Sequence, residues 1–324
     1  QEVVHIHYDH ELDKKFTVSS LVGLGFSLMN VPFGVSTTLS IGLVCGSSAT
    51  IFWGWIIFGF FSLFISLSLA EISSKFPSSG GVYHFAWILA PDGYNVILSW
   101  FVGWYLVVGN LLMFVSCSFG GAQFILSMFG MTQDHYKRDD IIILFVFMII
   151  VVSSALVNLK LQKLLDKFNH VSIYWTIFTI ILADIVIVVY GKEFHSIGDI
   201  VFHFDGSRSG YPFFITAFIG VFQFPCLTYN GYGAIISMSE EVTNPERNVP
   251  RGLILSILAT IVTGLAFIIP LLSVLPSLDI FDENPDIFPI DIIFSVTTKS
   301  YVVSFAIVLM ISGALVFATV GTLT

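Results

Sequence analysis

The chain has 324 residues, of which 56% are hydrophobic and only 11% are charged. Soluble domains carry roughly a quarter charged residues, so this composition argues against a water-soluble core and indicates lipid as the solvent. The net charge of −9 does not favour nucleic acid as a partner, and the three cysteines within apolar stretches do not indicate a disulfide framework.

Apolar windows of about 20 residues, the length that a helix needs to cross the hydrocarbon core, occur about eight times. The first, third and last of these windows are longer than one straight crossing, so each is expected to tilt or break. No flanking segment follows the last one, so we expect further helices beyond Thr324. The predicted spans are residues 17–45, 48–72, 95–129, 140–158, 168–190, 213–237, 252–275 and 289–324.

The basic residues predict a cytoplasmic N-terminus, because lysine and arginine favour cytoplasmic loops. With that orientation, eight of the 13 basic residues lie on the cytoplasmic side, four lie on the opposite side, and Lys299 falls inside the last span. The opposite side also collects acidic residues, among them Asp134, Asp279 and Asp286. We therefore predict a multi-pass integral membrane protein with a cytoplasmic N-terminal tail.

Two spans contain helix breakers near mid-membrane. Residues 30–38 read Asn-Val-Pro-Phe-Gly-Val-Ser-Thr-Thr, in which Pro32 removes a backbone donor. In the sixth span, Pro225 precedes the run Thr-Tyr-Asn-Gly-Tyr-Gly at 228–233. Either segment alone is also compatible with an ordinary kink, since Pro and Gly are common in membrane helices. Together they occupy equivalent positions if five-helix halves repeat with inverted topology, and such pairs indicate a transport site.

Several stretches carry a family resemblance. The run G-L-G-F-S-L-M-N-V-P-F-G at 23–34 resembles the first helix of the amino acid–polyamine–organocation superfamily. The runs S-L-S-L-A-E-I-S-S-K-F-P at 66–77 and S-M-S-E-E-V-T-N-P-E-R-N at 237–248 resemble its second helix and the loop after its sixth. Further motifs, such as S-W-F-V-G-W-Y-L at 99–106, are similar to the fungal branch of choline, GABA and polyamine permeases, and most of all to polyamine transporters of the yeast Golgi.

The resemblance implies an all-α, LeuT-type inverted-repeat transporter fold, normally with twelve helices, and alternating access around a site between helices 1, 3, 6 and 8. It also implies proton coupling and a Golgi or post-Golgi vesicle membrane, with the plasma or vacuolar membrane as alternatives. The implied segments are a tail at 1–16, helices 1–5 at 17–190, an outer-side loop at 191–212 and helices 6–8 at 213–324.

The predicted substrate site combines the two interrupted segments with nearby aromatic side chains. A cationic amine is bound by carboxylates, exposed helix carbonyls or aromatic faces, and each aromatic face attracts a cation by about 0.5–2 kcal/mol. For any one aromatic residue, packing between helices is the alternative role. The predicted substrate-binding residues are Asn30, Phe33, Gly34, Val35, Ser36, Thr37, Trp104, Tyr105, Phe222, Tyr229, Asn230, Gly231, Tyr232 and Gly233.

Asp184 lies near the middle of the fifth span, where an ionised carboxylate costs at least about 2.5–3.5 kcal/mol. It is expected to face protein or water, as a proton carrier, as a cation partner, or as a structural acid bonded to hydroxyls of another helix. Charged residues near the cytoplasmic helix ends predict gating contacts, among them ion pairs between the glutamates that end the sixth span and the arginines that follow, with solvated helix ends as the alternative. These residues are Glu71, Glu240, Glu241, Arg247 and Arg251.

No pattern indicates an enzyme, a cofactor or a metal site. The sequence has no P-loop lysine motif, no H-E-x-x-H and no G-x-S-x-G. His5, His7 and His10 cluster in a polar tail without a partner cysteine, which does not favour a bound metal ion.

The sequence therefore predicts a secondary active transporter for a small organic amine, most of all a polyamine such as putrescine or spermidine. The motif S-S-G-G at 78–81 follows the choline and GABA permeases, so GABA, choline or an amino acid stays an alternative substrate. Two other classes stay open. One is a receptor or sensor that keeps the fold without transporting, and the other is a structural membrane partner with side chains filling the space between Gly34 and Gly231.

Overall fold

The computed structural model describes residues 16–131, 138–160 and 165–321. Within these ranges the secondary structure is helical, apart from one isolated parallel bridge between Phe16 and Val242. The first half contains α1 (Val18–Leu28), α2 (Val31–Val44), α3 (Ser47–Lys75), α4 (Gly81–Leu89), α5 (Asn95–Gly130), α6 (Asp140–Lys160) and α7 (Leu165–Tyr190). The second half contains α8 (Ile197–Phe202), η2 (Ser207–Ser209), α9 (Phe213–Cys226), α10 (Ala234–Ser237), η3 (Ser239–Glu241), α11 (Pro245–Ser273), α12 (Asp279–Glu283), α13 (Pro289–Thr298) and α14 (Tyr301–Gly321).

Seven of the described helical segments are long and apolar enough to cross a membrane, with α1 and α2 counted as one interrupted segment. The others are α3, α5, α6, α7, α11 and α14. The predicted sixth span, residues 213–237, is divided between α9 and α10, and each part is too short to cross alone. The predicted polytopic, all-helical fold is confirmed.

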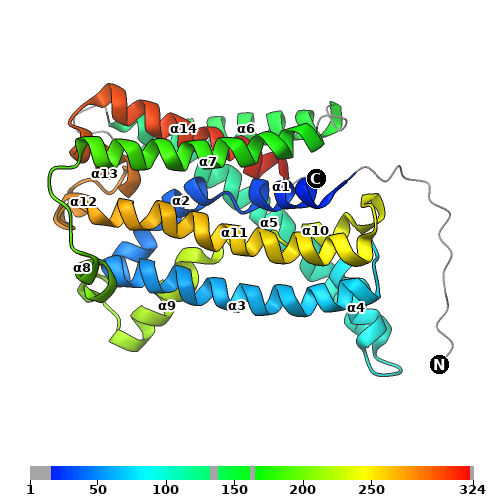
Figure 1. The fold of residues 1–324 in the computed structure, drawn as a ribbon. Helices are drawn as coiled ribbons and strands as arrows, with labels where there is room; N and C mark the ends of the chain where they lie inside the picture. The colour runs from blue at the N-terminus through cyan, green and yellow to red at the C-terminus, as the bar shows by residue number, and fades with distance from the viewer. Residues whose placement is uncertain (1–15, 132–137, 161–164, 322–324) are drawn as a thin grey trace.

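The long helices α3, α7 and α11 lie side by side with nearly parallel axes, and α11 packs against both of the others (Figure 1). The short helices α8, α12 and α13 lie at one end of this bundle, which we call the α8 end. The helices α4 and α10 lie at the opposite end, the α4 end (Figure 1). The two ends provide the two faces that a membrane-spanning bundle presents to water.

The first span is interrupted at the predicted place. α1 ends at Leu28, and Asn30 leaves the helical conformation with φ −34° and ψ 93°. α2 then begins at Val31, with Pro32 in its first turn. Amides of the first turn make no hydrogen bond within the helix, so the lack of an amide hydrogen in proline costs no hydrogen bond there. The third span behaves differently. α5 is one unbroken helix of 36 residues, roughly 54 Å long at 1.5 Å per residue.

The predicted last span, 289–324, is wrong in its starting point. Lys299 adopts a left-handed conformation with φ 52° and ends the separate helix α13. The membrane-length helix α14 begins only at Tyr301. The apolar residues of α13 instead pack at the α8 end of the bundle, so hydropathy alone could not separate α13 from the span that follows it.

Close packing between α3 and α11 builds the centre of the bundle. Trp55 is fully buried and donates a hydrogen bond from Nε1 to the carbonyl of Ile261 at 3.2 Å. Any side chain on Gly264 would overlap the Trp55 indole ring, so the absence of one lets α11 approach α3. In contrast, α6 exposes Ile141, Leu144 and Phe145 on one face. An apolar face of this kind suits lipid or another helix rather than water.

Candidate functional site

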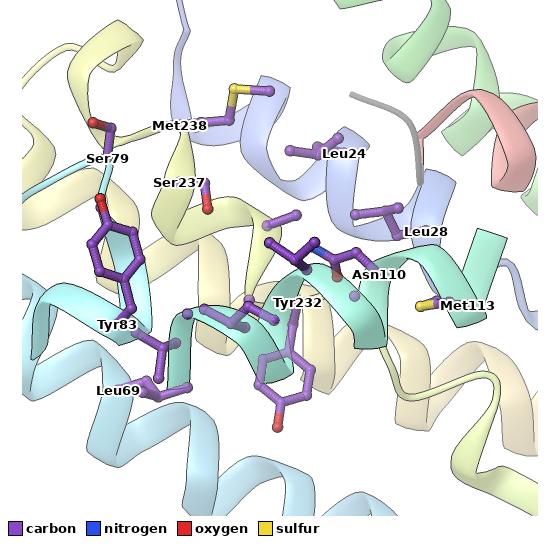
Figure 2. Close-up of a pocket in the computed structure, with 18 of the residues that line it drawn as sticks. Leu24, Leu28, Leu69, Ser79, Tyr83, Asn110, Met113, Tyr232, Ser237 and Met238 are labelled. Atoms are coloured by element: carbon purple, nitrogen blue, oxygen red, sulfur yellow. The ribbon is translucent and has the colours of Figure 1, made fainter. Parts of the chain in front are cut away.

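A cavity of about 1540 Å³ opens at the α4 end and ends where the two interrupted helices meet. Leu24 and Leu28 of α1, Asn110 and Met113 of α5, and Tyr232 of the α9–α10 link surround this space (Figure 2). Neither α2 nor α9 contributes a lining residue. The cavity is therefore one-sided, and the breaks in the two helices form its inner limit.

The two breaks contact each other directly. Thr228 packs against Gly34, and the backbone of Gly231, in a left-handed conformation with φ 96°, lies against the Leu28 side chain. A Cβ on Gly231 would lie 2.9 Å from Cβ of Leu28. Side chains thus fill the contact between the breaks, which was the arrangement expected of a structural partner, but they leave the large cavity beside them open.

The break in the first span is also attached to α14. Ser27 Oγ donates to the carbonyl of Phe317 at 2.9 Å, and Asn30 Nδ2 donates to the carbonyl of Ala314 at 3.0 Å. The Oδ1 atom of Asn30 and the hydroxyl of Thr228 are buried and have no hydrogen-bond partner among the described residues. The junction therefore keeps unused acceptors next to the inner limit of the cavity.

Five of the predicted substrate-binding residues line the cavity. These are Trp104 of α5 and Asn230, Gly231, Tyr232 and Gly233 of the α9–α10 link. Their assignment as ligand-binding residues stays a prediction, but the structure brings them to one space.

Tyr229, from the same link, points away from the cavity. It is only 1% exposed, and its ring lies 4.8 Å from that of Trp55 and 5.6 Å from that of Phe58 between centroids. Its hydroxyl donates to the Trp55 carbonyl at 3.4 Å. Tyr229 thus packs the link onto α3.

The remaining predicted residues do not line the cavity. Tyr105 is 76% exposed on the outer side of α5, and Phe33 is buried against Phe124. Phe222 packs on Phe58, Phe61 and Phe218. Val35, Ser36 and Thr37 lie on α2 beyond the break, where the two hydroxyls donate to carbonyls of their own helix. Gly34 and Asn30 belong to the junction itself.

Sequence reasoning found only Trp104 from a stripe of cavity residues along α5 and missed the others. The lining includes Val96, Ser99, Trp100, Gly103, Trp104, Val107, Asn110 and Met113, which follow the three- and four-residue spacing of one helix face. Aromatic and small polar residues at that spacing were the signal that marks this face. The helix α4 adds Tyr83 and Trp87 and lies within a stretch that the sequence analysis treated as a loop.

Glu241 is the only carboxylate in the described lining, which contains no lysine or arginine. The adjacent Glu240 does not pair with Arg247 or Arg251. It accepts a hydrogen bond from Ser79 Oγ. Among the described residues no ion pair joins Glu240 or Glu241 to either arginine, so the predicted ion-pair gate has no counterpart there. Because opposite charges attract, the field of this cavity favours a cation.

Two other predicted residues lie away from the cavity. Asp184 is half-buried on α7, and its Oδ1 atom is buried without a hydrogen-bond partner among the described residues. Glu71 is exposed near the end of α3. The histidines His5, His7 and His10 lie outside the described residues.

The α8 end is held closed by several contacts. Arg208 donates to Asp279 Oδ1 at 2.7 Å and to the Leu278 carbonyl at 3.0 Å, and it also pairs with Asp282. His195 Nε2 lies 2.9 Å from the Leu275 carbonyl. These contacts join the segment before α9 and the segment after α7 to the region around α12.

At the α4 end, main-chain hydrogen bonds join the beginning of α1 to the segment after η3. The amide of Phe16 donates to the carbonyl of Glu241, and the amide of Thr243 donates to the carbonyl of Phe16, both at 3.1 Å. This pairing lies beside the cavity, which Phe16 and Glu241 both line. The start of α1 and the segment before α11 are thereby connected at the cavity entrance.

Together, the apolar spanning helices and the one-sided cavity at two interrupted spans define a polytopic membrane protein of the permease type. A family model described as amino acid permease matches residues 16–323, and the chain belongs to that family. The family is one of permeases and not of enzymes.

Curated relatives agree with this assignment. The chain is 37% identical to "Polyamine transporter TPO5" of Saccharomyces cerevisiae over 100% of this chain and 53% of the relative. It is 30% identical to "Amino-acid permease BAT1" of Arabidopsis thaliana over 81% of this chain and 52% of the relative. It is 25% identical to "GABA-specific permease" of Saccharomyces cerevisiae over 99% of this chain and 57% of the relative. The chain thus spans about half the length of these relatives.

Proposed function

We propose that the protein is a secondary active transporter that moves a small organic amine, most of all a polyamine, across a membrane by alternating access. The cavity at the two interrupted helices is the main support. Its described lining has one carboxylate, no basic side chain and several aromatic faces, a combination that favours an ammonium group. The names of the relatives point in the same direction, since a polyamine transporter is among them.

Alternating access is supported by the asymmetry between the two ends. The cavity is open at the α4 end, whereas the contacts of Arg208 and His195 close the α8 end. The reverse arrangement requires the α8 end to open and the α4 end to close around the substrate. In our proposal Trp104, Tyr232 and Glu241 contact the amine. The junction of Asn30, Gly34 and Thr228 closes the path from the cavity to the α8 end.

The α4 end is assigned to the cytoplasm. Lys75, Arg247 and Arg251 lie at that end of α3 and α11, as basic residues of cytoplasmic segments do. Arg208 at the opposite end is neutralised by two aspartates. We assign the protein to a Golgi or post-Golgi membrane, with the plasma or vacuolar membrane as alternatives, and imaging of a tagged protein in cells decides among them.

Uptake into proteoliposomes containing the purified full-length protein tests the proposed function. We expect uptake of radiolabelled putrescine or spermidine when a pH gradient is imposed, and little uptake without one. Glu241→Gln should raise the KM for spermidine about fivefold, which corresponds to one exposed ion pair. Glu283→Gln, at the α8 end, is the matched control and should leave KM unchanged.

The alternative substrates give distinct outcomes. Uptake of choline, GABA or a neutral amino acid without any polyamine uptake would move the substrate assignment within the family. Binding of spermidine without flux, unaffected by Asp184→Asn, would indicate a receptor or sensor. In a proton-coupled transporter, Asp184→Asn should still bind spermidine, but spermidine uptake should no longer depend on the pH gradient.

A further inference from the structure

Asp291 is a buried acid that neither the sequence analysis nor the proposed site includes. It lies in the first turn of α13 and is fully buried. Its Oδ2 atom is hydrogen-bonded to Ser127 Oγ of α5. The same Ser127 oxygen accepts a hydrogen bond from the amide of Phe288 at 2.7 Å. Since that amide uses one lone pair of Ser127, the hydroxyl proton is directed toward Asp291, and the three groups join α13 to α5.

The second oxygen of Asp291 has no partner among the residues that the structure describes. Oδ1 is buried and makes no hydrogen bond with any described residue. The neighbouring α13 residues Ile290, Ile293 and Phe294 belong to the main apolar core, and the Phe288 ring lies edge-on against Phe124. An ionised carboxylate here would have one strong donor for two charged oxygens. Leaving such a charge incompletely paired in an apolar site is strongly unfavourable, whereas the neutral acid avoids that cost.

No opposite charge compensates Asp291 from the elements packed around it. α13 contacts α2, α7 and α14, and Ser127 connects it to α5. Within the described residues α2 carries no titratable side chain, and the one on α14 is Tyr301, which is 64% exposed. On α5 the titratable side chains are Tyr105, which is exposed, and Cys117. α7 contributes Asp184 and Tyr190 to the half nearer α13, with Lys167, His170 and Tyr174 in its other half.

The charged groups that flank α13 along the chain are directed elsewhere. Asp286 lies 3.9 Å from Arg138 as an ion pair, and Lys299 is exposed at the end of α13. Asp291 is therefore the one acid of this segment that combines complete burial, a hydroxyl partner on another helix and an unpaired oxygen. That combination suits a group that holds a proton while α13 stays in place.

We propose that Asp291 is a proton-binding site that keeps α13 packed against α5 while protonated, and that releases its proton when the α8 end opens. On opening, the O–H bond of the carboxyl breaks, the proton passes to water at the α8 end, and the hydrated carboxylate remains. Closure reverses each step. Asp291 thereby links proton release to one half of the transport cycle, a role that rests on the proposed function and is separate from that of Asp184.

Infrared spectroscopy of the full-length protein in lipid vesicles tests the proton directly and needs no substrate. At pH 7 the wild type should show a carbonyl stretching band of a protonated carboxyl that Asp291→Asn lacks. Glu283→Gln changes an exposed acid at the same end and should keep the band. Identical spectra of wild type and Asp291→Asn at pH 7 would overturn the proposal.

Hydrogen exchange of the 289–298 peptide tests the link between the proton and packing. After correction for intrinsic exchange, its exchange should speed up roughly tenfold per pH unit between the ordinary pKa of an aspartate, about 3.9, and the pH at which the packed carboxyl itself ionises, and should level off above that pH. Asp291→Asn should remove this pH dependence. A dependence of the same size in Asp291→Asn would contradict the proposal.

A second variant covers the case in which Asp291→Asn does not fold. Ser127→Ala keeps the acid but removes its partner, so the carboxyl band should shift in frequency and the peptide should exchange faster at every pH. An unshifted band would exclude the Ser127 contact. If these results hold while polyamine uptake fails, the proton site stands and only the transported substrate is wrong.

Discussion

The hydroxyl of Thr228 occupies the place where the first side-chain atom of residue 34 would lie if Gly34 were any other residue. Gly34 is in the first turn of α2, and Thr228 lies in the link between α9 and α10 that interrupts the sixth span. The two interrupted helices are therefore in contact through one residue with no side chain and one whose buried hydroxyl has no hydrogen-bond partner among the described residues. In the proposed transport cycle, this contact separates the cavity from the α8 end.

Gly34→Ala tests the contact. The added methyl group overlaps Thr228, so we expect a loss of about 1–3 kcal/mol in unfolding free energy from overpacking, together with reduced uptake. Gly109→Ala is the control, because nothing lies within 4 Å of its new Cβ and alanine favours a helix by about 0.5–1 kcal/mol over glycine. Thermal unfolding in detergent and vesicle uptake measure both effects. Adding Thr228→Ala should partly restore Gly34→Ala, and full stability of Gly34→Ala alone would disprove the overlap.

Trp104→Ala tests the aromatic wall of the cavity. Removing one aromatic face should weaken binding of a cationic amine by about 0.5–2 kcal/mol, or roughly two- to thirtyfold in Kd. Phe145→Ala removes an aromatic ring of α6 that is 68% exposed and lies outside the cavity. Equilibrium binding of radiolabelled spermidine to both variants measures the difference. Equal affinities would show that the amine does not contact Trp104.

Arg208→Lys tests the closure of the α8 end. A lysine cannot reach Asp279, Asp282 and the Leu278 carbonyl together, because it lacks the planar fork of donors. We expect faster hydrogen exchange in the 278–283 segment and a larger fraction of molecules open at the α8 end. Arg138→Lys is the matched control, since the contact of Arg138 with Asp286 in the described part of the chain is one long ion pair, at 3.9 Å. Unchanged exchange in Arg208→Lys would assign the closure to other contacts.

The helix α8 should loosen in acid. Hydrogen bonds from the side chain and the amide of Ser196 lower the pKa of Asp199, with His195 and His203 adding to the effect. A lowered pKa means that the ionised acid stabilises α8 above its ordinary pKa of about 3.9, and that this contribution is lost as the pH falls through the lowered value.

Hydrogen exchange of residues 196–203 between pH 6 and pH 3 measures this effect. Ser196→Ala should make α8 exchange faster at pH 6, because an N-cap is worth about 1 kcal/mol, and should reduce the further increase in acid. Ser207→Ala is the control. A hydrogen bond from Ser207 likewise lowers the pKa of Asp205, but Asp205 lies outside α8. An equal acid response in Ser196→Ala and wild type would exclude the proposed cause.

Hydropathy and helix breakers predicted the spanning helices and both interruptions, because these depend on local composition. Asn30 and Pro32 interrupt the first span whatever packs against it. The run 228–233 interrupts the sixth span in the same way. The start of the last span was different. Lys299 takes a left-handed conformation that no local glycine or proline indicates, so α13 could be separated from α14 only through its packing at the α8 end.

The candidate site was predictable only in part, because a residue near a helix break can point to either side of it. Asn230 and Tyr232 face the cavity, while Tyr229 between Thr228 and Asn230 packs on Trp55. The choice depends on the rotation of the unwound link, which sequence does not specify. Asp291 shows the same limit, since its burial and its contact with Ser127 of α5, which distinguish it from the exposed acids nearby, depend on packing between distant segments.

The pairing of Phe16 with the 241–243 segment has a consequence for how variation can accumulate near the cavity entrance. The pairing uses main-chain atoms, so it tolerates almost any side chain at these positions except proline, which has no amide hydrogen to donate. In the proposed transporter, side chains at this entrance can therefore change without breaking the connection between α1 and the segment before α11. Substrate selectivity can then evolve separately from the main-chain contacts that hold the entrance together.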